Sequence, residues 1–220
     1  MIYVLNVLKL FNHYQKGNKM QNPTLLNKFK LKLINAFKSF INNIKTNWKK
    51  ILVLYAILLT TFTIFLLIDQ LTKEFLFDPN KEWNKNDPST FKDYKIIGIR
   101  SVWHDGVTFI EDANIGLIQT LSIIIVVILL LTPLFSDLDH FNFAILFVMV
   151  FGIMMAGDLG NAIDRFRFQK GVKDIFYLPW KDTGTFNFAD TSIFFSIGSI
   201  ITLTIVKVIY EYAIDKKQKN

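Results

Sequence analysis

The chain has 220 residues, of which 51% are hydrophobic and 20% are charged, with a formal net charge of +7 and no cysteine. This composition excludes a disordered chain, a collagen-like fibre, a disulfide scaffold, a Cys-ligated metal site and a Cys nucleophile. The mean hydropathy of +0.32 is high for a chain whose first 50 residues hold ten lysines, so a membrane protein is the first hypothesis.

Residues 1–50 form the first predicted unit, a basic cytoplasmic N-terminal extension without an acidic residue. Apolar residues recur at helical spacing between its lysines, namely Leu26, Phe29, Leu33, Phe37, Phe40, Ile41 and Ile44. This pattern predicts a basic amphipathic helix on the anionic inner leaflet of a membrane. A dispensable tail, or upstream sequence before a translation start at Met20, is the alternative that stays open.

Residues 51–215 form the second predicted unit, a four-span membrane domain. Its apolar runs are long enough to cross a bilayer and cover about residues 51–68, 115–135, 141–156 and 191–209. Lys207 is the only ionisable residue inside these runs, near an end where a lysine can snorkel to the surface. Four such runs in one chain favour a membrane all-α fold over buried helices of a soluble protein.

The positions of the lysines predict the orientation. The extension is basic, and so is the C-terminal tail with Lys216, Lys217 and Lys219, which places both termini in the cytoplasm by the positive-inside rule. Residues 69–112 and 157–190 then lie outside, and residues 136–140 form a tight inner turn. We therefore expect a multi-pass protein of the cell membrane that contacts lipid, and we expect no nucleic-acid partner for the positive charge.

The outer segment 70–112 has the mixed composition of a small folded structure. Residues 94–102 alternate in polarity as a strand does, and residues 106–110 are its predicted partner. A short extracytoplasmic sheet is therefore predicted.

Polar residues collect at the outer ends of the spans: Asp69 and Lys73 after the first, Asn161, Asp164 and Arg165 after the third, Asp174 in the following loop, and Asn187 and Asp190 at the start of the fourth. Ionisable groups at membrane depth are costly unless they are paired or functional. Each has a structural alternative: ion pairs Asp69–Lys73 and Asp164–Arg165, an N-cap role for Asp190, and simple solvation for Asp174. Their convergence at one depth favours a functional site.

Two carboxyl groups held close together share a proton, so that one acts as a base and the other as an acid. Such a pair activates water for attack on an amide without a metal or a covalent intermediate. The histidines, at positions 13, 104 and 140, lie in separate segments, so neither a His-rich metal site nor a Ser-His-Asp triad is predicted. Arg165 favours an ionised Asp164, which suits a structural anchor better than a general acid, and either Asp164 or Asp174, which has no arginine neighbour in the sequence, could partner Asp190.

Four motifs in chain order resemble the lipoprotein signal peptidase family, also called signal peptidase II or prolipoprotein signal peptidase. They are D-Q-x-x-K at 69–73, G-N-x-x-D-R at 160–165, a segment similar to the family's G-x-V-x-D-F that reads G-V-K-D-I at 171–175, and N-x-A-D-[ST] at 187–191. The resemblance covers roughly residues 51–210. It implies an aspartic endopeptidase without a cofactor that removes the signal peptide from bacterial prolipoproteins by cutting before a diacylglyceryl-modified Cys, with Asp174 and Asp190 as the catalytic residues.

The resemblance also implies substrate-binding or supporting roles for Asp69, Lys73, Asn161, Asp164, Arg165 and Asn187. The family usually has N-x-G-x-x-F in the outer segment, where residues 104–109 read H-D-G-V-T-F. His104 therefore stands in the place of the Asn, and Gly106 matches the family Gly. Lys173 replaces a residue that is usually apolar.

Two other classes of membrane protein fit less well. A presenilin-like intramembrane aspartyl protease carries G-x-G-D, whereas residues 155–158 read M-A-G-D, and four spans are too few. A small transporter or a non-enzymatic scaffold would use the ion pairs structurally but would leave the N-F-A-D of residues 187–190 unexplained. A coupled carrier would also place its acids near the middle of the bilayer.

Overall fold

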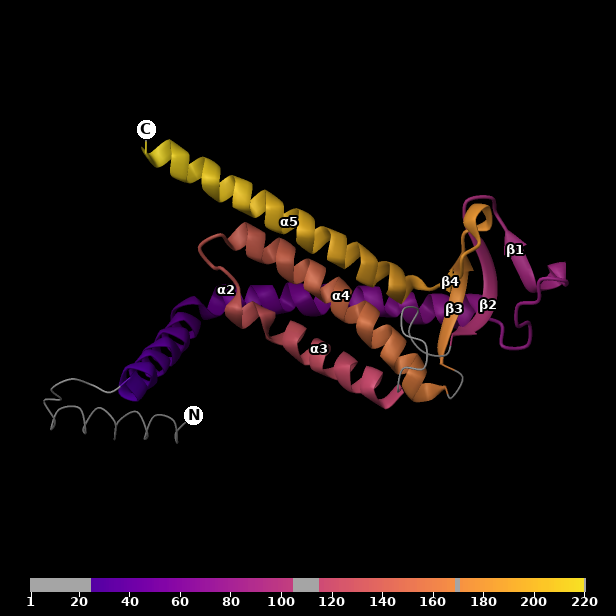
Figure 1. Ribbon diagram of the computed structural model, residues 1–220, viewed down its shortest axis with the longest axis horizontal. Helices are drawn as coiled ribbons and strands as arrows, with labels where there is room; N and C mark the ends of the chain where they lie inside the picture. The colour runs from indigo at the N-terminus through magenta and orange to yellow at the C-terminus, as the bar shows by residue number, and fades with distance from the viewer. Residues whose placement is uncertain (1–24, 105–114, 169–170, 220) are drawn as a thin grey trace, which may run out of the picture. The chain divides into compact units, whose positions relative to one another are not determined.

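The computed structural model describes residues 25–104, 115–168 and 171–219 (Figure 1). Its elements in chain order are α2 (Leu25–Leu76), η1 (Pro88–Thr90), β1 (Phe91–Asp93), β2 (Gly98–His104), α3 (Ile115–Phe135), α4 (Phe141–Arg167), β3 (Val172–Tyr177), η2 (Pro179–Lys181), β4 (Thr185–Phe186) and α5 (Phe188–Lys219). Among these described residues, four helices are long and apolar enough to span a membrane, and the strands form one small antiparallel sheet, which confirms the predicted fold class. The chain divides into two compact units, residues 1–48 and residues 49–220.

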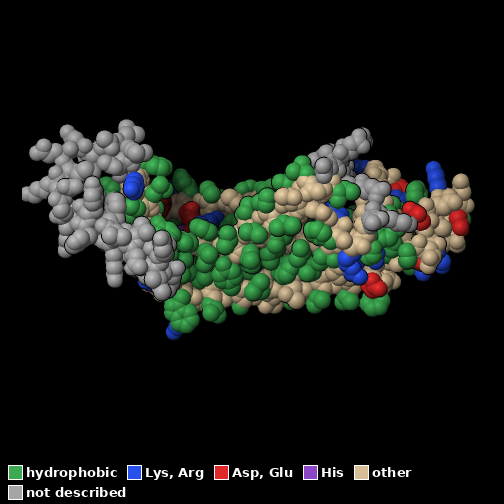
Figure 2. All heavy atoms as spheres, turned by 90° about the horizontal axis from the view of Figure 1, so that it is seen from below, with side chains coloured by type: hydrophobic (Ala, Val, Ile, Leu, Met, Phe, Trp, Pro, Cys, Tyr) green, Lys and Arg blue, Asp and Glu red, His purple; other side chains and the backbone are tan. Residues whose placement is uncertain are grey.

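Within the second unit, α4 is the central helix and packs against both α3 and α5. In the most apolar 18-residue stretch of α4, 50% of the residues are buried, compared with 11–17% in the corresponding stretches of the other three helices. The remaining helix surfaces therefore point their apolar side chains outward, and Figure 2 shows a broad belt of hydrophobic side chains over them. Such a belt is the surface that lipid chains require.

α4 also approaches α2 closely at Gly152. A Cβ atom at this position would lie 2.7 Å from the backbone oxygen of Leu58 and 3.0 Å from the Cβ of Thr61. The two helices can therefore keep this separation only if residue 152 has no side chain.

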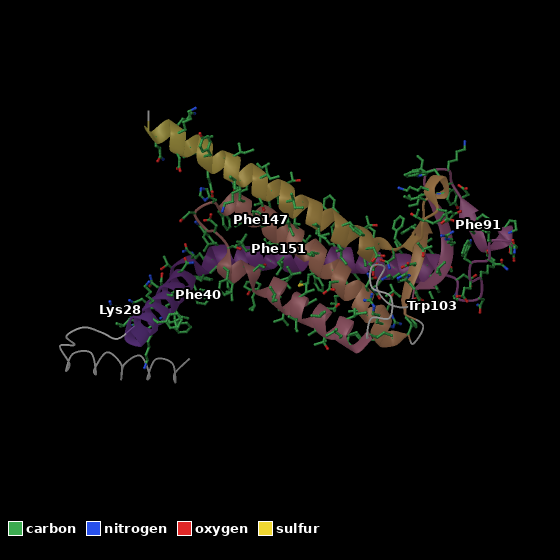
Figure 3. All side chains as sticks on the ribbon, viewed as in Figure 1. Lys28, Phe40, Phe91, Trp103, Phe147 and Phe151 are labelled. Carbon is green, nitrogen blue, oxygen red and sulfur yellow. The ribbon has the colours of Figure 1, made fainter. Side chains whose placement is uncertain are left out.

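The sheet covers one end of the helices, called here the sheet end (Figure 1). Its strands are ordered β1-β2-β3-β4, and Val102 of β2 lies opposite Asp174 of β3. Trp103 of β2, labelled in Figure 3, packs against Phe77 after α2 and Phe168 after α4, with ring centroids 4.7 and 5.3 Å apart. These contacts attach the sheet to the ends of two helices.

The predicted strand 94–102 is displaced in the structure to Gly98–His104. Residues 94–97 instead form the turn between β1 and β2, in which Lys95 has a φ of 73° and the Tyr94 N–H donates to the Ile97 carbonyl. β2 pairs with β1 and β3, whereas its predicted partner, 106–110, lies outside the described residues.

A second polar cluster lies at the opposite end of the helices, between the α3–α4 turn and α5. Lys207, which lies near the end of its span, places its Nζ 2.7 Å from Asp137 Oδ2 and 3.4 Å from Glu211 Oε1. Asp137 also contacts the His140 ring at 2.9 Å. In the described part of the chain, one group of acidic and histidine side chains has metal-ligand spacing, namely Asp137, His140 and Glu211. The Lys207 ammonium already pairs with the Asp137 and Glu211 carboxylates of this group.

Replacing Gly152 by alanine should force α2 and α4 apart and lower the free energy of unfolding by about 1–3 kcal/mol. The matched control is Gly198→Ala on α5, where an added Cβ has nothing within 4 Å. Thermal unfolding in detergent, followed by tryptophan fluorescence, compares the two variants. Equal melting temperatures would show that the α2–α4 approach is not tight.

Candidate active site

A buried ammonium group is the centre of the polar network at the sheet end. Lys73 is only 2% exposed, and its Nζ lies 3.0 Å from Asp69 Oδ2 and 3.0 Å from Asp164 Oδ2. It also donates to Asn161 Oδ1 at 3.1 Å, so its three N–H donors meet three acceptors. The sequence suggested Arg165 as an ion-pair partner of Asp164, and the structure pairs Asp164 with Lys73 from another helix. Arg165 lies within electrostatic reach of Asp190 and Asp164.

Asp69 extends this network to the start of α5. Its Oδ1 accepts a hydrogen bond from the Ala189 backbone N–H at 2.9 Å, and its Oδ2 accepts one from the Gln70 side chain at 3.0 Å. A Cβ at residue 160 would lie 2.5 Å from Asp69 Oδ2, so the Gly160 of the G-N motif is required by this carboxylate. One side chain thereby connects α2, α4 and α5.

Asn187 and Asp190 cap the N-terminus of α5 reciprocally. The Asp190 N–H donates to Asn187 Oδ1 at 2.9 Å, and the Asn187 N–H donates to Asp190 Oδ2 at 3.1 Å. This is the capping-box arrangement, in which Asn187 is the N-cap and Asp190 is the third helical residue. The interpretation of Asp190 as the N-cap itself is therefore wrong, because α5 begins at Phe188.

Asp174 lies in the strand β3 and not in a loop as predicted, because residues 172–177 pair with β2 and β4. Its carboxyl group is buried and accepts from Asn187 Nδ2 at 3.0 Å and from Thr185 Oγ1 at 3.1 Å. Thr185 was not recognised in the sequence, because its position depends on the pairing of β3 with β4.

Two side-chain amides connect Asp174 to Asp190. Asn187 Nδ2 donates both to Asp174 Oδ1 and to Asn161 Oδ1, each at 3.0 Å. Asn161 Nδ2 donates in turn to Asp190 Oδ1 at 2.8 Å. The structure therefore brings the two predicted catalytic carboxyl groups into one hydrogen-bonded network with the Asp69–Lys73–Asp164 cluster.

The surroundings of Asp174 favour its protonated form. Burial, followed by the negative charge of Asp190, raises the pKa of the Asp174 carboxyl to about 6. The half-buried His104 acts in the opposite direction, as do the hydrogen bonds from Thr185 and Asn187. A carboxyl with this pKa keeps its proton to higher pH than an ordinary aspartate does and can donate it. Gly106, the remaining predicted site residue, lies outside the described residues.

Two further features near the site carried little sequence signal. Ser122 of α3 donates to Asp158 Oδ1 of α4 at 2.9 Å, and this hydrogen bond joins α3 to α4. Lys173, which replaces a usually apolar residue, places its ammonium over the rings of Phe168 and Phe77, 4.6 and 5.4 Å from their centroids. This stacking explains how a lysine is accommodated beside Asp174.

Comparison with known proteins gives a family and a fold. A family model described as signal peptidase (SPase) II matches residues 61–207. Two solved structures, each described as a bacterial membrane enzyme, are similar to the chain with TM-scores of 0.56 and 0.53 and identities of 20% and 22%. They cover 69% and 66% of this chain and 88% and 90% of their own chains. No curated protein sequence matches significantly.

Replacing Lys73 by methionine should lower the free energy of unfolding by about 3–5 kcal/mol, because Asp69 and Asp164 would be left buried without their cation. Lys173→Met is the matched control, since that lysine faces the exposed Glu74 at 4.0 Å and should contribute about 1 kcal/mol or less. Thermal unfolding of both purified variants measures the difference. A Lys73→Met protein as stable as the control would contradict the central role of this ammonium.

Proposed function

The chain belongs to the signal peptidase II family, and on this premise we propose that it is a lipoprotein signal peptidase with an aspartic mechanism. The family implies a hydrolase of the bacterial membrane that acts on lipoprotein precursors. The finer proposal is that the enzyme removes the signal peptide by cleaving before a diacylglyceryl-modified Cys, without a cofactor. The observation that carries it is the hydrogen-bonded link between the carboxyl groups of Asp174 and Asp190 through two asparagines.

In the proposed reaction Asp190 and Asp174 divide the roles of base and acid. The ionised carboxylate takes a proton from water, whose oxygen attacks the carbonyl carbon of the scissile bond. The protonated carboxyl donates to the carbonyl oxygen, and a tetrahedral intermediate forms. The C–N bond then breaks as the carboxyl that took the proton from water gives it to the leaving nitrogen. The other carboxylate takes a proton from a hydroxyl of the intermediate, which restores the carbonyl and both starting protonation states. The raised pKa of Asp174 supports it as the acid at the start of the cycle.

The other predicted residues take supporting roles in this proposal. Asn161 and Asn187 orient the two carboxyl groups, while Lys73, Asp69 and Asp164 hold the helix ends that carry Asn161 and Asp190. Arg165 adds positive charge within reach of Asp190. We assign His104 and Gly106 to the substrate side, since His104 ends the strand that pairs with β3 beside Asp174.

We also propose that both termini are cytoplasmic and that the site lies at the outer face of a bacterial cell membrane. The support is the concentration of lysines in residues 1–50 and in the C-terminal tail, since basic residues remain on the cytoplasmic side. A lipid-modified precursor lies in the same membrane, with its scissile bond near the interface.

Replacing either carboxyl group by an amide tests the assignment. Asp174→Asn and Asp190→Asn should each reduce cleavage of a diacylglyceryl-modified prolipoprotein by at least ~10²-fold, because the shared proton is lost. Both variants should fold normally, since asparagine keeps the size of the side chain and remains a good residue near a helix start. The assay is cleavage per folded molecule of purified protein.

Asp164→Asn is the matched control for these two variants. It should reduce the amount of folded protein because it removes one partner of Lys73, while each folded molecule keeps most of its activity. A well-folded but inactive Asp164→Asn protein beside an active Asp174→Asn protein would make Asp164 the partner of Asp190 and overturn the assignment.

The pH dependence tests Asp174 in another way. Thr185→Val removes a hydrogen bond that lowers the pKa of Asp174, so the pKa should rise and the shared proton should persist to higher pH. The alkaline limb of kcat/KM should therefore move upward by about 0.5–1 pH unit. Thr183→Val, at an exposed position two residues before Thr185 and outside β4, should leave the profile unchanged. A downward shift, or none, would contradict the role of Asp174.

A further inference from the structure

The first unit carries an apolar stripe on a helix. Residues 28–46 of α2 are helical, and Phe29, Leu33 and Phe37 are 61%, 56% and 42% exposed. Together with Phe40 and Ile44 they fall within about 80° of the helix circumference at 3.6 residues per turn. Figure 3 labels Lys28 and Phe40 on this helix. A stripe of this width is enough to seat a helix on an apolar surface.

The opposite side of the helix is positively charged. Lys28, Lys32 and Lys45 lie outside the apolar stripe, and residues 1–50 contain no acidic side chain to balance them. A basic amphipathic helix of this kind fits either an acidic partner protein or an anionic membrane surface. The choice between these partners depends on where the helix is held.

The helix is covalently continuous with a membrane span. α2 runs from Leu25 to Leu76, and within it Asn47 has non-helical backbone angles, φ −108° and ψ 18°. The Asn47 side chain donates to Asn43 Oδ1 at 2.6 Å. Because the span begins directly after this point, the basic helix is tethered at the bilayer surface at high effective concentration.

We propose that residues 28–46 bind the surface of an anionic bilayer, with Phe29, Leu33 and Phe37 in the interface and the lysines among the lipid headgroups. The segment is then a second membrane-binding element, separate from the four spans and from the catalytic network. Apolar burial and electrostatic attraction to anionic lipid both contribute to binding of this type. The inference goes beyond the proposed peptidase function and does not depend on it.

The absence of cysteine permits a direct test on the full-length chain. Phe37→Cys on the apolar stripe and Asn35→Cys on the opposite side are each labelled with an environment-sensitive fluorophore and reconstituted into vesicles. The vesicles contain phosphatidylcholine alone or phosphatidylcholine with phosphatidylglycerol, and lipids brominated in the acyl chains serve as the quencher. In the anionic vesicles the label at residue 37 should be quenched at least about twofold more than the label at residue 35.

The charge contribution is tested separately. The difference between the two labels should shrink in phosphatidylcholine alone, at high salt, and in a variant with Lys28, Lys32 and Lys45 changed to Gln. Equal quenching at residues 35 and 37 would overturn the proposal. A difference in quenching that none of these three changes reduces would also overturn it. Protection of residue 37 that grows with protein density, without quenching by lipid, would indicate contact with a second copy and would also overturn it. Cleavage is not part of the readout.

Discussion

The buried ammonium of Lys73 is the interaction on which the sheet end of the molecule depends. A buried cation is tolerated only when every donor is paired, since an uncompensated charge in a low-dielectric interior costs several kcal/mol. Here the partners come from two helices: Asp69 from α2, and Asp164 with Asn161 from α4. Because Asp69 also accepts from the Ala189 N–H, the start of α5 is fixed by the same charge. Three helix ends are thereby held in one relative position.

The same ammonium determines the orientation of the amides that lead to the carboxyl pair. A lysine can only donate, so the atom of Asn161 that faces Lys73 must be its oxygen, and its nitrogen must point to Asp190. The backbone N–H of Asp190 likewise requires the oxygen of Asn187, which leaves the Asn187 nitrogen for Asp174. Each amide therefore has one allowed orientation, and no rearrangement is needed to present donors to both carboxyl groups.

This preorganisation has a cost in stability. The pKa of Asp174 is raised from 3.8 to about 6, so the folded chain holds a proton that the unfolded chain has released. The stability of the folded state consequently falls as the pH rises between these two values. The Lys73 cluster offsets this cost by fixing the helix ends through paired charges.

Local patterns in the sequence were sufficient for the four helices and for the identity of the polar residues at their ends. Apolar run length and i,i+4 spacing are properties of neighbouring residues, which is why the Asp69–Lys73 pair could be predicted. The partner of Asp164, the position of Asp174 in a strand and the reciprocal cap of Asn187 and Asp190 were decided only by the tertiary structure. The first depends on how closely α2 approaches α4, and the second on the pairing of β3 with β2 and β4. The third depends on where α5 begins once Asp69 has bound the first turn of that helix. All three depend on interactions between distant segments, which leave no periodic signal in a single sequence.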